Sequence, residues 1–210
     1  MPRALKVYHE LFEFDAEVRT HFPVFCGIDE AGRGPLAGDV YAAAVILPPD
    51  IEIAGLNDSK KLSEARREDL APIIKEKALA WSIASASVAE IEQLNILQAA
   101  LLAMKRAVEG LSIQPAFAIT DGNQKPPLEI PVDTIIHGDA KSASIAAASV
   151  LAKTARDAAL RQLDEQYPQY GFAAHKGYGT KAHYAAIDEY GLCPAHRPSF
   201  LKKYYEKRGE

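Results

Sequence analysis

The sequence predicts an α/β fold in which helices cover a mixed β-sheet. Two short apolar segments joined by a glycine-rich link come first, and further apolar segments then alternate with helix-like segments. This order is typical of a mixed sheet with helices on its faces. A chain of 210 residues can form one sizeable core, and no repeat or linker-like stretch divides it. We therefore expect a single domain over residues 1–210, in which residues 181–210 form a helical C-terminal extension.

The strands are predicted from short apolar runs bounded by Pro, Gly or polar residues. They lie at residues 24–29, 39–47, 81–88, 116–120 and 132–137. The second run ends at Pro48 and Pro49, and the third alternates apolar residues with Ser and Ala. Because the link from Gly32 to Gly38 is short, we expect the first two strands to pair antiparallel.

The helices are predicted from apolar residues that recur every three or four positions. They lie at residues 4–18, 63–79, 90–109, 142–166 and 181–190, and a helical tail follows. Ser63 is a capping residue for the second helix, and Gly110 ends the third. The many alanines of residues 142–166 let that helix lie close to the sheet. Residues 167–180 are expected to form a loop.

The charge of the chain argues against a nucleic-acid partner held by general electrostatics. Lys and Arg number 24 and Asp and Glu number 28, which gives a formal net charge of -4. The tail from His196 to Arg208 is an exception, because it carries five basic residues and one acidic residue. Such a run is either a solvated terminal helix or a surface that binds a phosphate backbone.

Apolar runs such as residues 42–47 are far shorter than the ~20 residues of a membrane-spanning helix. The first twenty residues mix charged and apolar side chains, which a secretory signal does not do. Cys26 and Cys193 lie far apart in the sequence and have no metal-binding spacing. We expect both to be reduced thiols and the protein to be cytoplasmic, with no membrane partner.

Four acidic residues stand where a strand ends or a helix begins: Asp29, Glu30, Asp121 and Asp139. Each alone is most simply explained as a turn or capping residue. Open α/β sheets, however, place their ligands at such edges. Carboxylates that converge there repel one another and raise each other's pKa unless a cation lies between them. Oxygen ligands favour Mg²⁺ or Mn²⁺, and such a site suits in-line attack at phosphorus.

Five motifs give the chain a recognisable family pattern. They are GIDEAGRGPLAG at residues 27–38, LNDSKKLSEARRE at 56–68, DGN at 121–123, HGDAKSASIAAASVLAKTARD at 137–157 and YGFAAHKGYGT at 170–180. In this order they resemble bacterial ribonuclease HII, the type 2 ribonuclease H, from about residue 24 to residue 200. The resemblance implies the ribonuclease H fold, a mixed five-stranded sheet flanked by helices, with a helical C-terminal part. Because only 23 residues precede the first predicted strand, type HII fits better than type HIII.

The resemblance also implies an activity and a metal site. It implies that Asp29, Glu30, Asp121 and Asp139 are catalytic and bind two Mg²⁺ or Mn²⁺ ions. The implied reaction cuts the RNA strand of RNA/DNA hybrids and single ribonucleotides in duplex DNA, leaving 3'-hydroxyl and 5'-phosphate ends. We expect Asp139 to be the more mobile fourth ligand, because it stands one turn before a helix whose N-terminus already favours negative charge.

Substrate contacts follow from the same resemblance. Gly32, Arg33 and Gly34 match the GRG element that reads the ribose 2'-hydroxyl, and glycines allow such close backbone approach. Tyr178 matches the tyrosine that stacks on the deoxyribose after the ribonucleotide, and Lys60 matches a lysine that holds a phosphate. Without the other motifs, the glycines indicate a tight turn and the tyrosine plain packing. Four further candidates for backbone contacts are Lys153, Arg156, His175 and Lys176.

The implied partners are RNA/DNA hybrids and ribonucleotide-containing duplex DNA, and a replication clamp is a candidate protein partner. We expect a monomer that works in ribonucleotide excision repair and DNA replication. Three alternatives stay open at this point. One is a dinucleotide-binding fingerprint formed by Gly32, Gly34 and Ala37, with Glu52 as the ribose acid. The others are a hybrid-binding module without catalysis and another polynucleotidyl transferase of the same fold.

Overall fold

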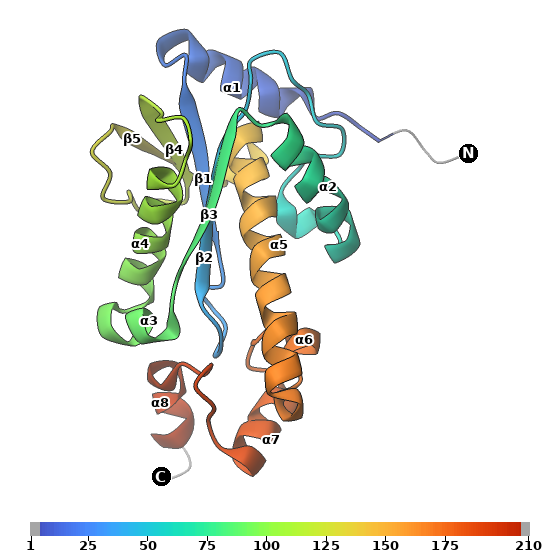
Figure 1. Cartoon of the computed structure of the whole chain (residues 1–210), viewed down its shortest axis with the longest axis vertical. Helices are drawn as coiled ribbons and strands as arrows, with labels where there is room; N and C mark the ends of the chain where they lie inside the picture. Colours follow the sequence, from blue (N-terminus) through green and yellow to red (C-terminus); the bar gives the residue numbers. More distant parts are fainter. Residues whose placement is uncertain (1–4, 207–210) are drawn as a thin grey trace.

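The computed structural model describes residues 5–206. A mixed five-stranded sheet forms its centre, with the strand order β3-β2-β1-β4-β5 (Figure 1). The strands are β1 (Phe25–Ala31), β2 (Val40–Ile46), β3 (Ala80–Ala86), β4 (Phe117–Asp121) and β5 (Val132–Ile135). β2 pairs antiparallel with β1 and β3, whereas β4 pairs parallel with β1 and β5. The predicted mixed sheet and the antiparallel pairing of its first two strands are confirmed.

Helices flank the sheet on both faces. They are α1 (His9–His21), α2 (Glu64–Lys77), α3 (Val88–Leu94), α4 (Ile96–Glu109), α5 (Ala143–Gln166), α6 (Phe172–His175), α7 (Lys181–Tyr190) and α8 (Pro198–Glu206). Three 3₁₀ turns add η1 (Ser59–Lys61), η2 (Gly138–Ala140) and η3 (Pro168–Tyr170). α4 covers one face, and α5 covers the other together with α1 and α2 (Figure 1). α6, α7 and α8 cluster at one end of the molecule, so the C-terminal part is helical, as predicted.

The alternation of side chains along β1 decides which residues face which helix. Cys26 and Ile28 join the core beneath α4. Gly27 faces α5 so closely that a Cβ there would collide with the backbone of Ser144. Asp29 therefore points to the α5 side of the sheet, and its neighbour Glu30 points to the α4 side.

One helix prediction and one strand prediction differ from the structure. The helix expected over residues 90–109 is two helices that meet at Asn95, whose φ of 73° interrupts the helical path. The Asn95 side chain accepts hydrogen bonds from the backbone N–H of Leu97 and Gln98, which makes it the cap of α4. The Ser87 and Glu90 side chains form a capping box that starts α3, so β3 ends before residue 87.

Smaller differences lie near the two ends of the chain. α1 begins at His9 rather than at residue 4, which lies outside the described residues, and it continues to His21. The predicted loop at residues 167–180 contains η3 and the single helical turn α6. Cys26 and Cys193 are both free thiols, as predicted. Between residues 5 and 206 we find no helix with the length and apolar character needed to span a membrane.

Candidate active site

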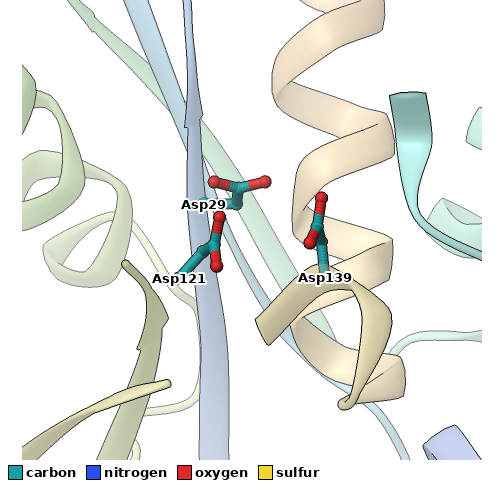
Figure 2. Close-up of side chains that lie close together, drawn as sticks. All are labelled: Asp29, Asp121 and Asp139. Carbon is teal, nitrogen blue, oxygen red and sulfur yellow. The ribbon is translucent and has the colours of Figure 1, made fainter. Parts of the chain in front are cut away.

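Three of the predicted acids meet at one edge of the sheet. Asp29 lies near the end of β1 and Asp121 at the end of β4, and the parallel pairing of these strands makes the two residues neighbours. Asp139 comes from η2, between β5 and α5. One carboxylate oxygen of each residue lies within 4.8 Å of the others, and Figure 2 shows the three side chains around a common space.

Backbone hydrogen bonds hold this arrangement. Oδ1 of Asp121 accepts a hydrogen bond of 2.7 Å from the backbone N–H of Gly138, the residue before Asp139. Oδ1 of Asp29 accepts another of 2.7 Å from the N–H of Glu30. Asp139 is only 2% exposed. The expectation that Asp139 is the more mobile of the four acids stays a prediction.

The electrostatics of the three carboxylates favour a bound cation. Burial, together with the negative charge of Glu30, holds the pKa of Asp29 well above its ordinary value. Burial also raises the pKa of Asp139, although Lys60 opposes this rise. Buried anions that repel one another are costly without a counter-charge. Three oxygen donors in this space match the ligand preference of Mg²⁺ and Mn²⁺, so the residues present fit a divalent ion.

Lys60 provides part of the counter-charge. Its Nζ lies 3.2 Å from Oδ2 of Asp139, while its side chain stays 74% exposed. Partial burial opposes the charged form, but the carboxylates of Asp139, Asp29 and Asp121 outweigh it and raise the pKa of Lys60. A single, mostly solvated ammonium does not neutralise three carboxylates. Lys60 thus leaves this acidic site available to an ion.

Glu30 borders the same cavity but is not part of the cluster that the other three acids form. Because consecutive residues of a strand point to opposite faces, its side chain leaves β1 on the α4 side. Oε1 of Glu30 lies 3.3 Å from Nη1 of Arg33. Burial raises the pKa of Glu30, with Arg33 acting in the opposite direction. The structure therefore brings Asp29, Asp121 and Asp139 together and places Glu30 beside them, paired with an arginine.

A cavity of about 300 Å³ opens next to the acids. Eight of the nine predicted site residues line it: Asp29, Glu30, Gly32, Arg33, Gly34, Lys60, Asp121 and Tyr178. The ninth, Asp139, contacts Lys60 at its border. A larger cavity of about 430 Å³ lies farther along α5 and contains none of the three clustered acids. We assign the chemistry to the smaller cavity, called the catalytic cavity below, because Asp29 and Asp121 line it and Asp139 contacts Lys60 of its lining.

The glycine loop and Tyr178 face each other across this cavity. Gly32 has a φ of 103°, and a Cβ at this position would collide with the Arg156 side chain. The guanidinium of Arg156 lies 5.9 Å from the centre of the Tyr178 ring, which is 48% exposed. A Cβ on Gly34 would lie 3.6 Å from Cε1 of the same ring. The loop backbone and the tyrosine ring thus lie side by side at this cavity.

A buried ionic group behind the cavity was not predicted. Asp157 accepts hydrogen bonds from Nη2 of Arg67, at 3.2 Å, and from Nζ of Lys153. Burial lowers the pKa of Lys153. Arg67 and Lys153 both line the cavity. Lys153 and Asp157 are four residues apart on α5, a spacing from which their pairing could have been predicted. Arg67 comes from α2, and no local sequence pattern indicates that it contacts Asp157.

Two of the further candidates are held by other parts of the protein. Nζ of Lys176 lies 2.8 Å from Oε1 of Glu64. His175 stacks on His183, with ring centres 4.3 Å apart, and its Nε2 contacts the carbonyl of Tyr170 at 2.7 Å. These contacts explain the positions of both side chains without a substrate.

A family model described as "Ribonuclease HII" matches residues 26–205. Ribonuclease HII of Laribacter hongkongensis is 63% identical over 177 residues, which cover 83% of this chain and 89% of that protein.

Solved structures share the fold. Ribonuclease H2 of Pyrococcus horikoshii has a TM-score of 0.72 at 24% identity, covering 89% of this chain and 99% of that one. Ribonuclease HII of Archaeoglobus fulgidus, solved in complex with PCNA, has a TM-score of 0.65 at 24% identity, covering 83% of this chain and 93% of that one. β1 is followed by an antiparallel strand rather than a helix, which removes the dinucleotide-binding alternative. On the strength of the sequence matches, the chain belongs to the ribonuclease HII family of RNA–DNA hybrid endoribonucleases.

Proposed function

We propose that this enzyme also cuts duplex DNA at single embedded ribonucleotides and leaves 3'-hydroxyl and 5'-phosphate ends. One observation carries the proposal. Two of the three clustered carboxylates, Asp29 and Asp121, line one cavity together with the glycine loop and the exposed ring of Tyr178, and the third, Asp139, contacts Lys60 of the same lining. The carboxylates would thus cut the strand at the same nucleotide whose 2'-hydroxyl contacts the glycine loop and whose neighbouring sugar contacts Tyr178.

The acids hold the metal in this proposal. Asp29, Asp121 and Asp139 offer oxygen ligands within 4.8 Å of one another. Glu30, which leaves β1 on the other face and pairs with Arg33, is the proposed fourth ligand. Two bound Mg²⁺ or Mn²⁺ ions would prepare water for in-line attack and stabilise the departing oxygen. Burial keeps the carboxylates apart from bulk water, which strengthens their interaction with a cation.

The remaining residues orient the substrate. The backbone of Gly32, Arg33 and Gly34 contacts the ribose 2'-hydroxyl, the one group that distinguishes RNA from DNA at a sugar. Tyr178 stacks on the following deoxyribose. Lys60, which is anchored near Asp139 and is mostly exposed, holds the phosphate.

The direct test uses an end-labelled DNA duplex that contains one ribonucleotide. We expect cleavage at the ribonucleotide with Mg²⁺ or Mn²⁺, no cleavage in a chelator, and product ends that a ligase and a phosphatase identify as 3'-hydroxyl and 5'-phosphate. The same duplex without the ribonucleotide is the control. If the enzyme cleaves an RNA/DNA hybrid but leaves the single-ribonucleotide duplex uncut, the proposal is contradicted. Binding without any metal-dependent cleavage would instead favour a non-catalytic module.

The proposal also covers the oligomeric state, the protein partner and the cellular role of the enzyme. We propose that the chain forms a single domain, because the two main core clusters share the central sheet. We also propose that it acts as a monomer. A replication clamp is a candidate partner, since the similar Archaeoglobus fulgidus protein was solved with PCNA. Cytoplasmic location and roles in ribonucleotide excision repair and DNA replication stay predictions. Size-exclusion chromatography with and without purified clamp tests the oligomeric state and the partner.

A further inference from the structure

Arg197 lies at the centre of the contacts between the C-terminal part and the glycine loop. Its side chain is fully buried. All of its side-chain hydrogen bonds in the described chain go to backbone carbonyls of residues 32–38. Nη2 donates to Gly32, at 2.8 Å, and to Gly38, at 2.6 Å, and Nε also donates to Gly38, at 2.8 Å. Nη1 donates to Pro35 at 2.9 Å and to Arg33 at 3.4 Å.

These contacts determine the direction of the peptide groups. In a trans peptide the carbonyl of one residue and the N–H of the next point in opposite directions. Because the carbonyls of Gly32 and Arg33 point toward Arg197, the N–H groups of Arg33 and Gly34 point away from it. A guanidinium can bind several carbonyls at once, whereas the single ammonium of a lysine has no such planar fork.

A third peptide of the same loop confirms this geometry. The carbonyl of Pro35 accepts from Arg197, and the N–H of Leu36 donates on the opposite side to the carbonyl of Gly177, at 2.8 Å. Gly177 directly precedes Tyr178, which lines the catalytic cavity. The side of the loop that faces away from Arg197 is therefore the side that faces the tyrosine.

The N–H groups of Arg33 and Gly34 have no acceptor within residues 5–206. Both residues line the catalytic cavity. We infer that Arg197 is a positioning residue, whose guanidinium turns these two N–H groups into the cavity as donors for the ribose 2'-hydroxyl. This inference rests on the proposed function and assigns the reading of the sugar to two named backbone groups and their support to one buried side chain.

A role in folding alone does not explain the arrangement fully. Arg197 has no carboxylate within ion-pair distance in the described chain, and a buried charge without such a partner is costly. Burial lowers its pKa to about 10, so the side chain still carries its charge at neutral pH. A charged donor polarises the carbonyls that it binds, which makes the N–H groups of the same peptides better donors.

The experiment compares Arg197→Lys with its parent, both in an Asp121→Asn background so that the duplex is bound and not cut. Affinity is measured by fluorescence anisotropy with Mg²⁺ for a one-ribonucleotide duplex and for an all-DNA duplex of the same sequence. We expect Arg197→Lys to reduce the ratio of the two affinities about tenfold. Affinity for the all-DNA duplex should stay within about twofold, because phosphate contacts do not depend on these amides.

Arg106→Lys is the matched control, because Arg106 binds Glu90 and the carbonyl of Ser85 and lies outside the cavity. Its affinity ratio should equal that of the parent. A folded Arg197→Lys variant with the parent's ratio would overturn the inference. A parent without any preference for the ribonucleotide would instead overturn the proposed function itself.

A second measurement covers the case in which Arg197→Lys does not fold. In the ¹⁵N-labelled parent, the Arg33 and Gly34 amides should exchange rapidly with solvent. They should become protected when the one-ribonucleotide duplex binds, and not with the all-DNA duplex. Equal protection by both duplexes, or by neither, would refute the assignment of these two N–H groups.

Discussion

Oδ1 of Asp121 accepts a 2.7 Å hydrogen bond from the backbone N–H of Gly138, which ties the end of β4 to the turn that carries Asp139. One carboxylate thus has two tasks. It supports the position of a second acid, and it contributes charge to the site that the two share with Asp29. An asparagine at this position keeps an acceptor oxygen but loses the charge, so the two tasks can be separated.

We therefore predict that Asp121→Asn abolishes cleavage while the fold persists. Without metal, its melting temperature should equal or exceed that of the parent, because a repelling charge has been removed. Mg²⁺ at about 100 times its Kd should stabilise the parent by about 2.7 kcal/mol and the variant much less. Thermal scans with and without Mg²⁺ check this. Asp133→Asn, which changes an exposed acid paired with Lys125, is the control. Near-normal turnover by Asp121→Asn would refute the metal site.

Lys60→Ala should bind Mg²⁺ more tightly and cleave more slowly. Nζ of Lys60 lies 3.2 Å from the Asp139 carboxylate, so it competes with an incoming cation. Because Lys60 is largely exposed, we expect only a several-fold gain in affinity, on the order of 1 kcal/mol or less. Calorimetric titration with Mg²⁺ measures it. Lys61→Ala, the exposed neighbour, should change neither property, and weaker Mg²⁺ binding by Lys60→Ala would contradict the proposed competition.

Tyr178→Ala should impair cleavage at an isolated ribonucleotide more than cleavage within continuous RNA. The ring is exposed and lies beside Gly34. In the proposed function its loss removes the stacking surface for the following deoxyribose. Loss of one stacking contact corresponds to about 1–3 kcal/mol, which is roughly tenfold or more in rate. Single-turnover rates on the two substrates give the ratio. Tyr178→Phe keeps the ring and should resemble the parent, and equal losses on both substrates would count against a junction role.

Lowering the pH should lower the free energy of unfolding, because His183 is neutral in the folded protein. The backbone N–H of Cys193 donates to Nδ1 of His196, which leaves Nε2 of His196 to donate to Nε2 of His183, at 3.1 Å. Nδ1 of His183 then donates to the carbonyl of Tyr178, at 3.0 Å. Both rings are thus neutral. Burial lowers the pKa of His183 to about 4.

The sign of this effect follows from proton uptake. Between pH 6.5 and pH 4 the unfolded chain protonates this histidine and the folded chain does not, so the free energy of unfolding falls as the pH falls. The loss should be on the order of 1–3 kcal/mol. Urea unfolding at pH 7, 5.5 and 4.5 measures it for the parent, for His183→Asn and for His21→Gln. The His183 variant should lose less stability than the other two; identical pH dependence in all three would exclude this histidine.

Several elements could be predicted because their signals are local. α7 was predicted with its observed bounds, and α5 within one residue, since Ser142 and Thr180 are capping residues next to clear helical patterns. The break at Asn95 was missed because apolar residues continue with helical spacing across it. Only the backbone conformation of Asn95 shows that its side chain caps the next helix instead of extending the previous one.

In the candidate site, too, some features could be predicted from the sequence and others only from the tertiary structure. The sequence by itself determined which acids stand at strand ends, and strand alternation would have indicated that Asp29 and Glu30 face opposite sides. Only the tertiary structure decided which acids meet, because the parallel pairing of β1 with β4 brings Asp121 beside Asp29. The same holds for Arg197, whose partners lie about 160 residues away in the sequence. Such contacts depend on long-range packing, which no local pattern of residues records.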